Sequence, residues 1–286
     1  MIDEFVLNGN YIKRYSRPEN KHLLILLSGQ SMGPRSFWDF RLPNGKTHSE
    51  YFFEAGIDVI LFDPIGYGKS TEFYSYDRKG YASQIINLTK AIDKEYTNKT
   101  LLGFSTSTNP ALIAAQSGYF TKLVCLSPAI FRVVDENFLK YDEVFTSDIN
   151  KLKEERIGKI SDMIIPKPNR VDGWEEAIME VNKTYTSYKD GFWSCPGSMV
   201  NDINSFYTIH KHDGYSPDSI KCDVLAIIGQ YDFEMYNSVN FTWFVRTFKP
   251  KFVNVPDSTH FSMWENNNHI TRQAIIDFIT NETEVH

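Results

Sequence analysis

The sequence lacks the features that mark secreted and membrane-spanning chains. Its 286 residues include only 3 cysteines, at wide spacing, which favours reduced thiols over a disulfide framework. No N-terminal signal peptide is visible, and the first apolar run, Leu23 to Leu27, is too short to span a bilayer. We therefore expect a cytoplasmic protein without a membrane span.

Clustered positive charge is also missing. The formal net charge is −6, and the acidic residues are spread along the chain. Binding to nucleic acid requires a basic patch or stripe, so the sequence gives a nucleic-acid partner little support. The 42% of hydrophobic and 15% of aromatic residues are enough for a sizeable core, which argues against a disordered chain.

Short apolar runs that end in turn residues recur along the sequence. Most are continuous rather than alternating, which is typical of strands buried on both faces of a parallel sheet. Segments with helical periodicity, such as 82–96 and 270–279, separate them. This alternation predicts an α/β protein with right-handed crossovers and a doubly wound, mostly parallel sheet. The predicted strands are 23–27, 58–62, 100–102, 123–126, 224–228 and 251–255.

The stretch 131–217 has a different character. It is rich in charged residues, is aromatic from Trp174 to Trp193, and contains no strand-like run. We interpret it as a mainly helical lid inserted between two parts of a core, 1–130 and 218–286. A set of ordinary crossover helices is the alternative.

A serine lies where an apolar run meets a helix of small residues. The strand predicted at 100–102 leads into Gly103-Phe-Ser105-Thr-Ser107, and the helix follows from Pro110. A sharp turn of this kind lifts the serine Oγ above the sheet. A serine hydroxyl is a weak nucleophile, and it needs a base as well as a group that orients the base. The alternative is that Ser105 only caps the helix.

An acid and a histidine follow further along the chain, each after another predicted strand. Asp232 comes directly after one predicted strand, and His260 follows the last one. The order predicts a triad in which Ser105 is the nucleophile, His260 the general base and Asp232 the orienting acid. The rival acid is Glu234 and the rival histidine is His269, at the start of the terminal helix.

These motifs resemble those of the α/β-hydrolase superfamily over nearly the whole chain outside the predicted lid. The serine turn is similar to G-x-S-x-G, with Ser107 in place of the second glycine. Gly229 to Asp232 is similar to the G-x-x-D of the acid, and Asp257 to His260 resembles the G-x-x-H of the base, with Asp257 in the glycine position. The resemblance implies the α/β-hydrolase fold and a hydrolase without a cofactor, most often acting on carboxylic esters.

The same resemblance extends to the loop after the first buried strand. Ser28-Gly-Gln30-Ser-Met-Gly33 looks like the H-G-x-x-G oxyanion loop, with Ser28 in place of histidine. By that match, the backbone N–H groups of Gln30 and Thr106 would bind the oxyanion. A plain glycine turn is the alternative.

Neither a nucleotide nor a metal is expected. Gly68-Lys-Ser70 ends like a Walker A loop, but that motif needs a glycine at the position of Asp63. The segment instead resembles D-x-x-G-x-G-x-S, which shapes a turn near the site of α/β-hydrolases. His210, His212 and Asp213 are too few ligands for a zinc assignment.

The expected partner is a small-molecule ester or related acyl compound. Acyltransfer, C–C bond hydrolysis or thioester hydrolysis on the same triad stays open, as does a non-catalytic ligand-binding protein, because the fold does not determine function. The oligomeric state is not readable from the sequence. Candidates for an apolar substrate pocket, each with the alternative of being lid core, are Phe37, Trp38, Trp174, Phe192 and Trp193.

Overall fold

The structure is a computed structural model of the chain. The residues that it describes are 1–29, 37–39, 41–42, 44–65, 69–70, 78–92, 95–129, 216–232 and 239–281. All but the last two residues of the predicted lid, 131–217, lie outside the described residues, so the lid stays a prediction.

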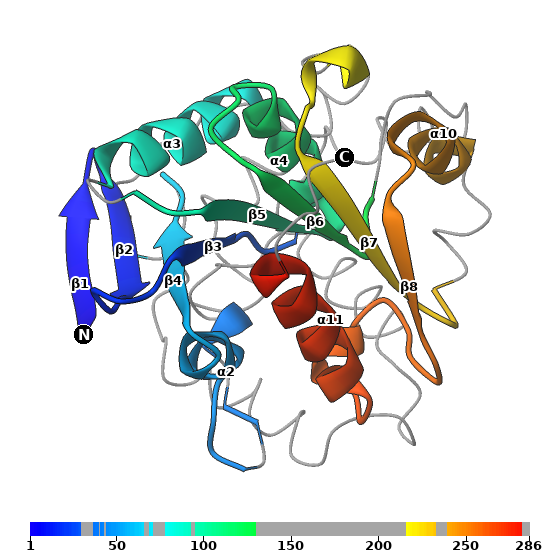
Figure 1. The fold of residues 1–286 in the computed structure, drawn as a ribbon, viewed down its shortest axis with the longest axis horizontal. Coiled ribbons are helices and arrows are strands. Elements are labelled where there is room, and N and C mark those ends of the chain that lie inside the picture. The colour runs from blue at the N-terminus through cyan, green and yellow to red at the C-terminus, as the bar shows by residue number, and fades with distance from the viewer. Residues whose placement is uncertain are drawn as a thin grey trace, which may run out of the picture.

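One eight-stranded sheet forms the centre of the fold, in the order β1-β2-β4-β3-β5-β6-β7-β8 (Figure 1). All neighbouring strands from β4 to β8 along this order are parallel, whereas β2 is antiparallel to both β1 and β4. The predicted mostly parallel, doubly wound sheet is therefore confirmed. The strands are β1 Ile2–Leu7, β2 Asn10–Tyr15, β3 His22–Leu26, β4 Ile57–Asp63, β5 Asn98–Phe104, β6 Lys122–Leu126, β7 Asp223–Gly229 and β8 Lys251–Val255.

Helices cover both faces of this sheet. The α-helices α2 and α11 pack on one face, and α3, α4 and α10 pack on the other (Figure 1). Their bounds are α2 His48–Glu54, α3 Arg78–Ala91, α4 Thr108–Ala115, α10 Val239–Phe248 and α11 Asn268–Thr280. The described residues also include the short 3-10 helices η1 Ser105–Ser107, η3 Pro217–Ser219 and η4 Ser262–Trp264.

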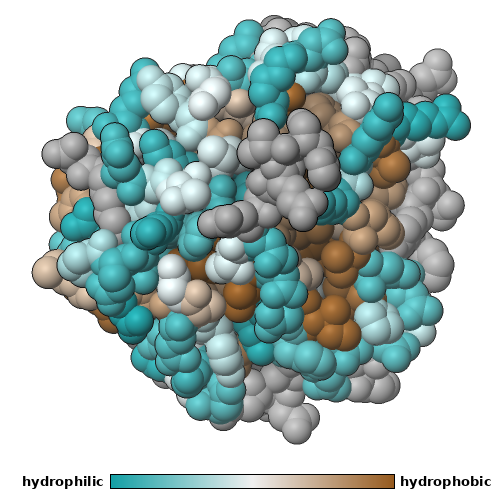
Figure 2. Space-filling model, viewed as in Figure 1, coloured by the Kyte–Doolittle hydropathy of each residue, from teal (hydrophilic) through white to brown (hydrophobic). Residues whose placement is uncertain are grey.

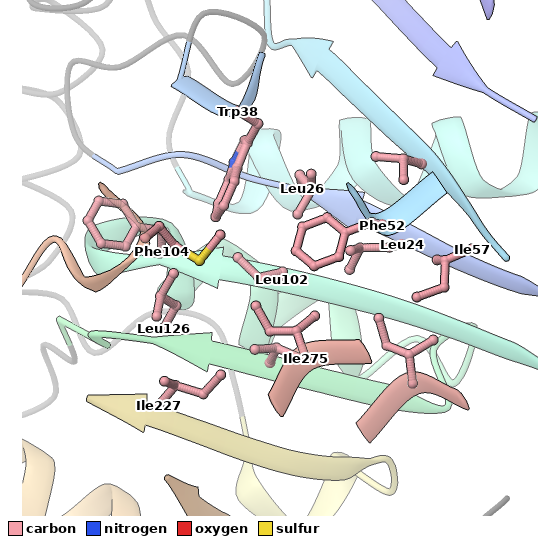
Figure 3. Packing of buried hydrophobic residues seen from close by; sticks show 14 of the residues in the cluster. Leu24, Leu26, Trp38, Phe52, Ile57, Leu102, Phe104, Leu126, Ile227 and Ile275 are labelled. Atoms are coloured by element: carbon pink, nitrogen blue, oxygen red, sulfur yellow. The ribbon is translucent and has the colours of Figure 1, made fainter. Parts of the chain in front are cut away.

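The central strands are apolar on both faces, which explains their continuous runs in the sequence. In β3, Leu24 and Leu26 belong to the cluster under α2 and α11, whereas Leu23 and Ile25 belong to the cluster under α3, α4 and α10. Figure 3 shows side chains of the first cluster gathered between the sheet and α11, including Leu102 of β5. Burying each such leucine contributes about 2 kcal/mol, so these strands are firmly held in the sheet.

The sheet edges are more exposed, and one of them was not predicted. The hairpin β1-β2 turns at Asn8 and Gly9, whose φ values of 50° and 83° are those of a tight two-residue turn. An Asn-Gly pair is a strong hairpin signal, but β1 is mostly exposed and its only continuous apolar run is the three residues 5–7. Hydrophilic residues cover most of the face seen in Figure 2, with smaller apolar areas between them.

The parallel strands direct their carboxyl ends to one edge of the sheet, and this positions the candidate site. Ser105 follows β5, Asp232 follows β7 and His260 follows β8. Because β6 pairs with both β5 and β7, the chain before and after the predicted lid lies in the same sheet. Residues far apart in the sequence are thus brought to one place, as expected for a doubly wound sheet.

Candidate active site

Ser105 has a strained backbone at the end of β5. Its φ of 52° lies in the left-handed region, which non-glycine residues adopt at a cost of about 1–3 kcal/mol and mostly at functional sites. The Ala129 N–H donates a hydrogen bond to the Ser105 carbonyl oxygen at 3.1 Å, which helps to hold this conformation. Both Ser105 and Thr106 are half-buried. The helix α4 takes Ser107 as its N-cap residue, not Ser105.

The two small residues that flank Ser105 have distinct local roles. A Cβ on Gly103 would lie 2.7 Å from Cα of Thr108, so only glycine allows β5 and α4 to approach this closely. Ser107 is buried, and its hydroxyl both accepts from the Phe104 N–H and donates to the Phe104 carbonyl oxygen, each at 2.9 Å. The serine that replaces the second glycine therefore ties the turn back to the strand.

His260 and Asp232 form a hydrogen-bonded pair. Nδ1 of His260 lies 2.9 Å from Oδ2 of Asp232, and their side chains are 13% and 3% exposed. A carboxylate at Nδ1 keeps the proton on that nitrogen, so that Nε2 is the basic atom of the neutral ring. The rival His269 is exposed at the start of α11, and the rival Glu234 lies outside the described residues.

The turns that carry this pair are interlocked through the backbone. A Cβ on Gly229 would lie 2.0 Å from the carbonyl oxygen of Thr259, so the position allows no side chain. The Tyr231 N–H donates to the Ser258 carbonyl oxygen at 2.8 Å. Asp257, in the glycine position of the sequence motif, has a φ of 49°, which explains why glycine is usual there.

The predicted oxyanion loop begins beside the nucleophile turn. A Cβ on Gly29 would lie 3.3 Å from Cβ of Ser105 and 3.0 Å from a ring carbon of Phe104. The indole N–H of Trp38 donates to the carbonyl oxygen of Leu27 at 3.0 Å and so supports the start of this loop. Gln30 lies outside the described residues, and Thr106 follows Ser105 directly in η1.

Aromatic rings pack behind the catalytic candidates. Phe37 and Trp38 are fully buried, and Phe37 stacks on Phe104 with ring centroids 4.9 Å apart. The Phe104 ring also lies 5.2 Å from the imidazole of His260, and Figure 3 shows Phe104 at the end of the cluster near Trp38. Phe37 and Trp38, which the sequence suggested as pocket residues, are therefore core residues next to the site. Trp174, Phe192 and Trp193 lie outside the described residues.

Sequence reasoning missed a second buried carboxylate, Glu265, which has no exposed surface. Burial raises its pKa, and the nearby Asp232 adds to this effect, whereas hydrogen bonds from Thr259 oppose it. The sequence feature that could have indicated Glu265 is its position as a single acidic residue directly after the apolar stretch Phe261 to Trp264, which follows His260.

Polar side chains of the Asp63 to Ser70 segment have structural partners. The Asp63 carboxylate accepts the Lys69 N–H at 3.0 Å, and the Ser70 hydroxyl accepts the Tyr11 N–H at 2.7 Å. These bonds tie the turn after β4 to β2. His210, His212 and Asp213 lie outside the described residues.

Within the described ranges, no group of three or more His, Cys, Asp or Glu residues is arranged to hold a metal ion. The same residues include no helix that is both long and apolar enough to cross a membrane.

No protein-family model and no curated protein sequence matches this chain. Several solved structures, however, match the chain over nearly its whole length. An esterase from Exiguobacterium antarcticum is 17% identical with a TM-score of 0.67, and the match covers 95% of this chain and 96% of that one. An enol-lactonase from Burkholderia xenovorans LB400 is 12% identical with a TM-score of 0.67, over 98% of this chain and 100% of that one. A protein from Chitinophaga pinensis described as having the α/β-hydrolase fold is 15% identical with a TM-score of 0.66, over 98% of both chains.

Nearly complete coverage of these structures shows that the likeness concerns the whole architecture. The chain has the α/β-hydrolase fold, as the resemblance of its sequence motifs implied.

Proposed function

We propose that this protein is a serine hydrolase that cleaves a carboxylic ester or a related acyl bond through Ser105, His260 and Asp232. One observation carries the proposal: a serine in a left-handed backbone conformation lies at the same sheet edge as a hydrogen-bonded His–Asp pair. The names of the structural neighbours, an esterase and an enol-lactonase among them, are consistent with hydrolysis.

Acylation starts when Nε2 of His260 takes the hydroxyl proton of Ser105. The Oγ bonds to the carbonyl carbon of the substrate, and the carbonyl oxygen becomes an oxyanion. Asp232 holds the imidazole through Nδ1 and stabilises its charged form. The oxyanion then collapses, His260 gives its proton to the leaving alkoxide, and an acyl-enzyme remains on Ser105. In the second half, His260 takes a proton from a water molecule whose oxygen bonds to the acyl carbon. The bond from that carbon to Oγ of Ser105 then breaks, His260 returns the proton to Oγ, and the carboxylic acid leaves.

Two backbone N–H groups are proposed to bind the oxyanion, those of Thr106 and Gln30. Support comes from the half-buried position of Thr106 beside Ser105 and from the close approach of Gly29 to the nucleophile turn. Losing one donor of this kind typically costs about 100- to 1000-fold in kcat.

The segment 131–217 is proposed to be a lid that sets substrate choice, with Trp174, Phe192 and Trp193 toward the substrate. Phe37 and Trp38 would form the apolar wall behind the nucleophile. We propose a small-molecule substrate, no cofactor and a cytoplasmic location. Because the triad alone does not select an acyl chain, substrate identity depends on this segment.

The direct test is labelling of the purified protein with a fluorophosphonate, followed by mass-spectrometric mapping of the modified residue. We expect one adduct, on the peptide that contains Ser105. Assays with p-nitrophenyl esters of increasing acyl length should then show turnover, with short chains as the first substrates to try.

The alternatives have distinct outcomes in the same assays. Acyl transfer to an added alcohol in preference to water would indicate an acyltransferase. Selective turnover of a thioester or a diketone would indicate the corresponding hydrolase. Tight binding of small apolar ligands without labelling or turnover would refute the hydrolase proposal in favour of a ligand-binding protein.

A further inference from the structure

A fully buried carboxylate holds the turn that carries His260. Glu265 follows η4 as its C-cap residue and has no exposed surface, although ionisable side chains are rarely buried without a partner. Its partner is Thr259, the residue directly before His260. The Thr259 N–H lies 2.9 Å from Oε1 and 2.8 Å from Oε2 of Glu265, and the Thr259 hydroxyl lies 2.5 Å from Oε1.

The peptide on the other side of Thr259 is also held. Its carbonyl oxygen packs against Gly229, where a Cβ would approach it to 2.0 Å. Gly229 in turn accepts the Asp232 N–H at 3.0 Å. Thr259 is therefore fixed between Glu265 and the turn of the catalytic acid, so a shift of Thr259 would move His260 relative to Asp232.

The 2.9 Å bond between His260 and Asp232 is sensitive to such a shift, because hydrogen bonds weaken steeply with distance and angle. We propose that Glu265 is a positioning residue for His260: it holds the Thr259 peptide in the place where the imidazole keeps its hydrogen bond to Asp232. This inference rests on the proposed function, which makes His260 the general base.

A charged group from another turn acts on Glu265. Asp232, from the turn after β7, lies close enough to influence it electrostatically. Trp264, the residue before Glu265, has its ring centroid 5.6 Å from that of His48 in α2, and Arg272 of α11 acts electrostatically on His48. The charge of an ionised Glu265 favours the protonated form of His260, as does the charge of Asp232.

The test replaces Glu265 by glutamine, which has nearly the same shape and keeps one oxygen acceptor but no charge. We expect Glu265→Gln to lower kcat by about tenfold or more with little change in KM, because a small misplacement of a catalytic group carries such a cost. The acid limb of the pH–rate profile should move to lower pH. NMR of isotope-labelled histidine should show the titration of His260, assigned with His260→Asn, moving down by about half a pH unit or more.

Asp257→Asn is the matched control. It neutralises an exposed carboxylate in the same turn, which accepts a hydrogen bond from the Tyr231 hydroxyl at 3.1 Å. We expect this variant to keep the kcat and the His260 titration of the wild type. Should Glu265→Gln fail to fold, Thr259→Val removes the hydroxyl bond to Glu265 and the 3.5 Å bond that the hydroxyl accepts from the Phe261 N–H. Because the Glu265 charge and the Thr259 N–H bonds remain, this variant should lower kcat by a smaller factor, about three- to fivefold, and leave the His260 titration in place.

The inference is overturned if a folded Glu265→Gln variant keeps kcat within about twofold and titrates His260 at the wild-type pH, or if Thr259→Val, used in its place, keeps kcat within about twofold. A lower melting temperature with unchanged kcat and titration would mean that Glu265 is only structural, which also overturns it. A wild-type protein that neither labels nor hydrolyses refutes the proposed function, whereas the NMR titration still decides the role of Glu265.

Discussion

Gly229 lies against the carbonyl oxygen of Thr259 so closely that a Cβ there would approach this oxygen to 2.0 Å. Atoms do not approach this closely without displacement, so a side chain at 229 must push the two turns apart. The turns carry Asp232 and His260, whose hydrogen bond measures 2.9 Å. The contact therefore links a single glycine to the geometry of the proposed triad.

From this contact we expect Gly229→Ala to lose at least about 100-fold in kcat, because the base and the acid separate. Overpacking should also lower the free energy of unfolding by about 1–3 kcal/mol. Gly118→Ala is the control: its φ is +74° but nothing lies within 4 Å of the added Cβ. It should lose stability without losing kcat. Equal kcat in wild type and Gly229→Ala would contradict the interpretation.

Ser105 should be essential to activity and unfavourable to stability. We expect Ser105→Ala to lower hydrolysis by at least about three orders of magnitude. Ser105→Gly should abolish activity as well but raise the melting temperature, because glycine adopts the φ of 52° without strain. Ser107→Ala, which removes the bonds to Phe104, should instead destabilise the fold by about 1 kcal/mol. Near-wild-type turnover by Ser105→Ala would rule out Ser105 as nucleophile.

Kinetic measurements on two alanine variants should show which of the two candidate histidines is the general base. His260→Ala removes the partner of Asp232, so activity should fall by at least about three orders of magnitude. His269→Ala changes an exposed residue of α11 and should leave kcat/KM as in the wild type. Steady-state assays with one short-chain ester decide the matter, and the reverse pattern would move the role of the base to His269.

Stability should depend on pH through His48 in α2. The ring is fully buried, and burial together with nearby Arg272 lowers its pKa to about 3. The unfolded chain therefore binds a proton that the native state excludes. Stability is fully present above the unfolded pKa of about 6.5 and is lost as pH falls from there toward about 3, by at most about 5 kcal/mol.

Urea denaturation between pH 7 and pH 4 measures this loss, because over this range the unfolded histidine takes up its proton while the native ring stays neutral. His48→Phe should flatten the pH dependence, whereas His269→Gln, at an exposed position, should leave it as in the wild type. Parallel curves for His48→Phe and wild type would show that other groups are responsible.

The central sheet and the chain order of the proposed catalytic residues could be predicted from the sequence. Strands buried on both faces need apolar residues at successive positions, so β3, β4 and β6 can be recognised in the sequence as continuous apolar runs. Parallel strands bring their carboxyl ends to one edge, so residues after β5, β7 and β8 could be expected to meet. The edge hairpin was missed because partly exposed strands lack this signal, although Asn8-Gly9 marks its turn.

The contacts that hold these catalytic candidates in place could not be predicted, because they depend on tertiary packing. Nothing local in the sequence indicates that Gly229 must pack on Thr259, since that contact depends on how two loops from neighbouring strands cross. The same holds for Glu265, because burial of a carboxylate depends on the elements that cover it and on the N–H groups that reach it. The positive φ of Ser105 likewise follows from the packing of β5 on α4, not from serine, which does not prefer that conformation.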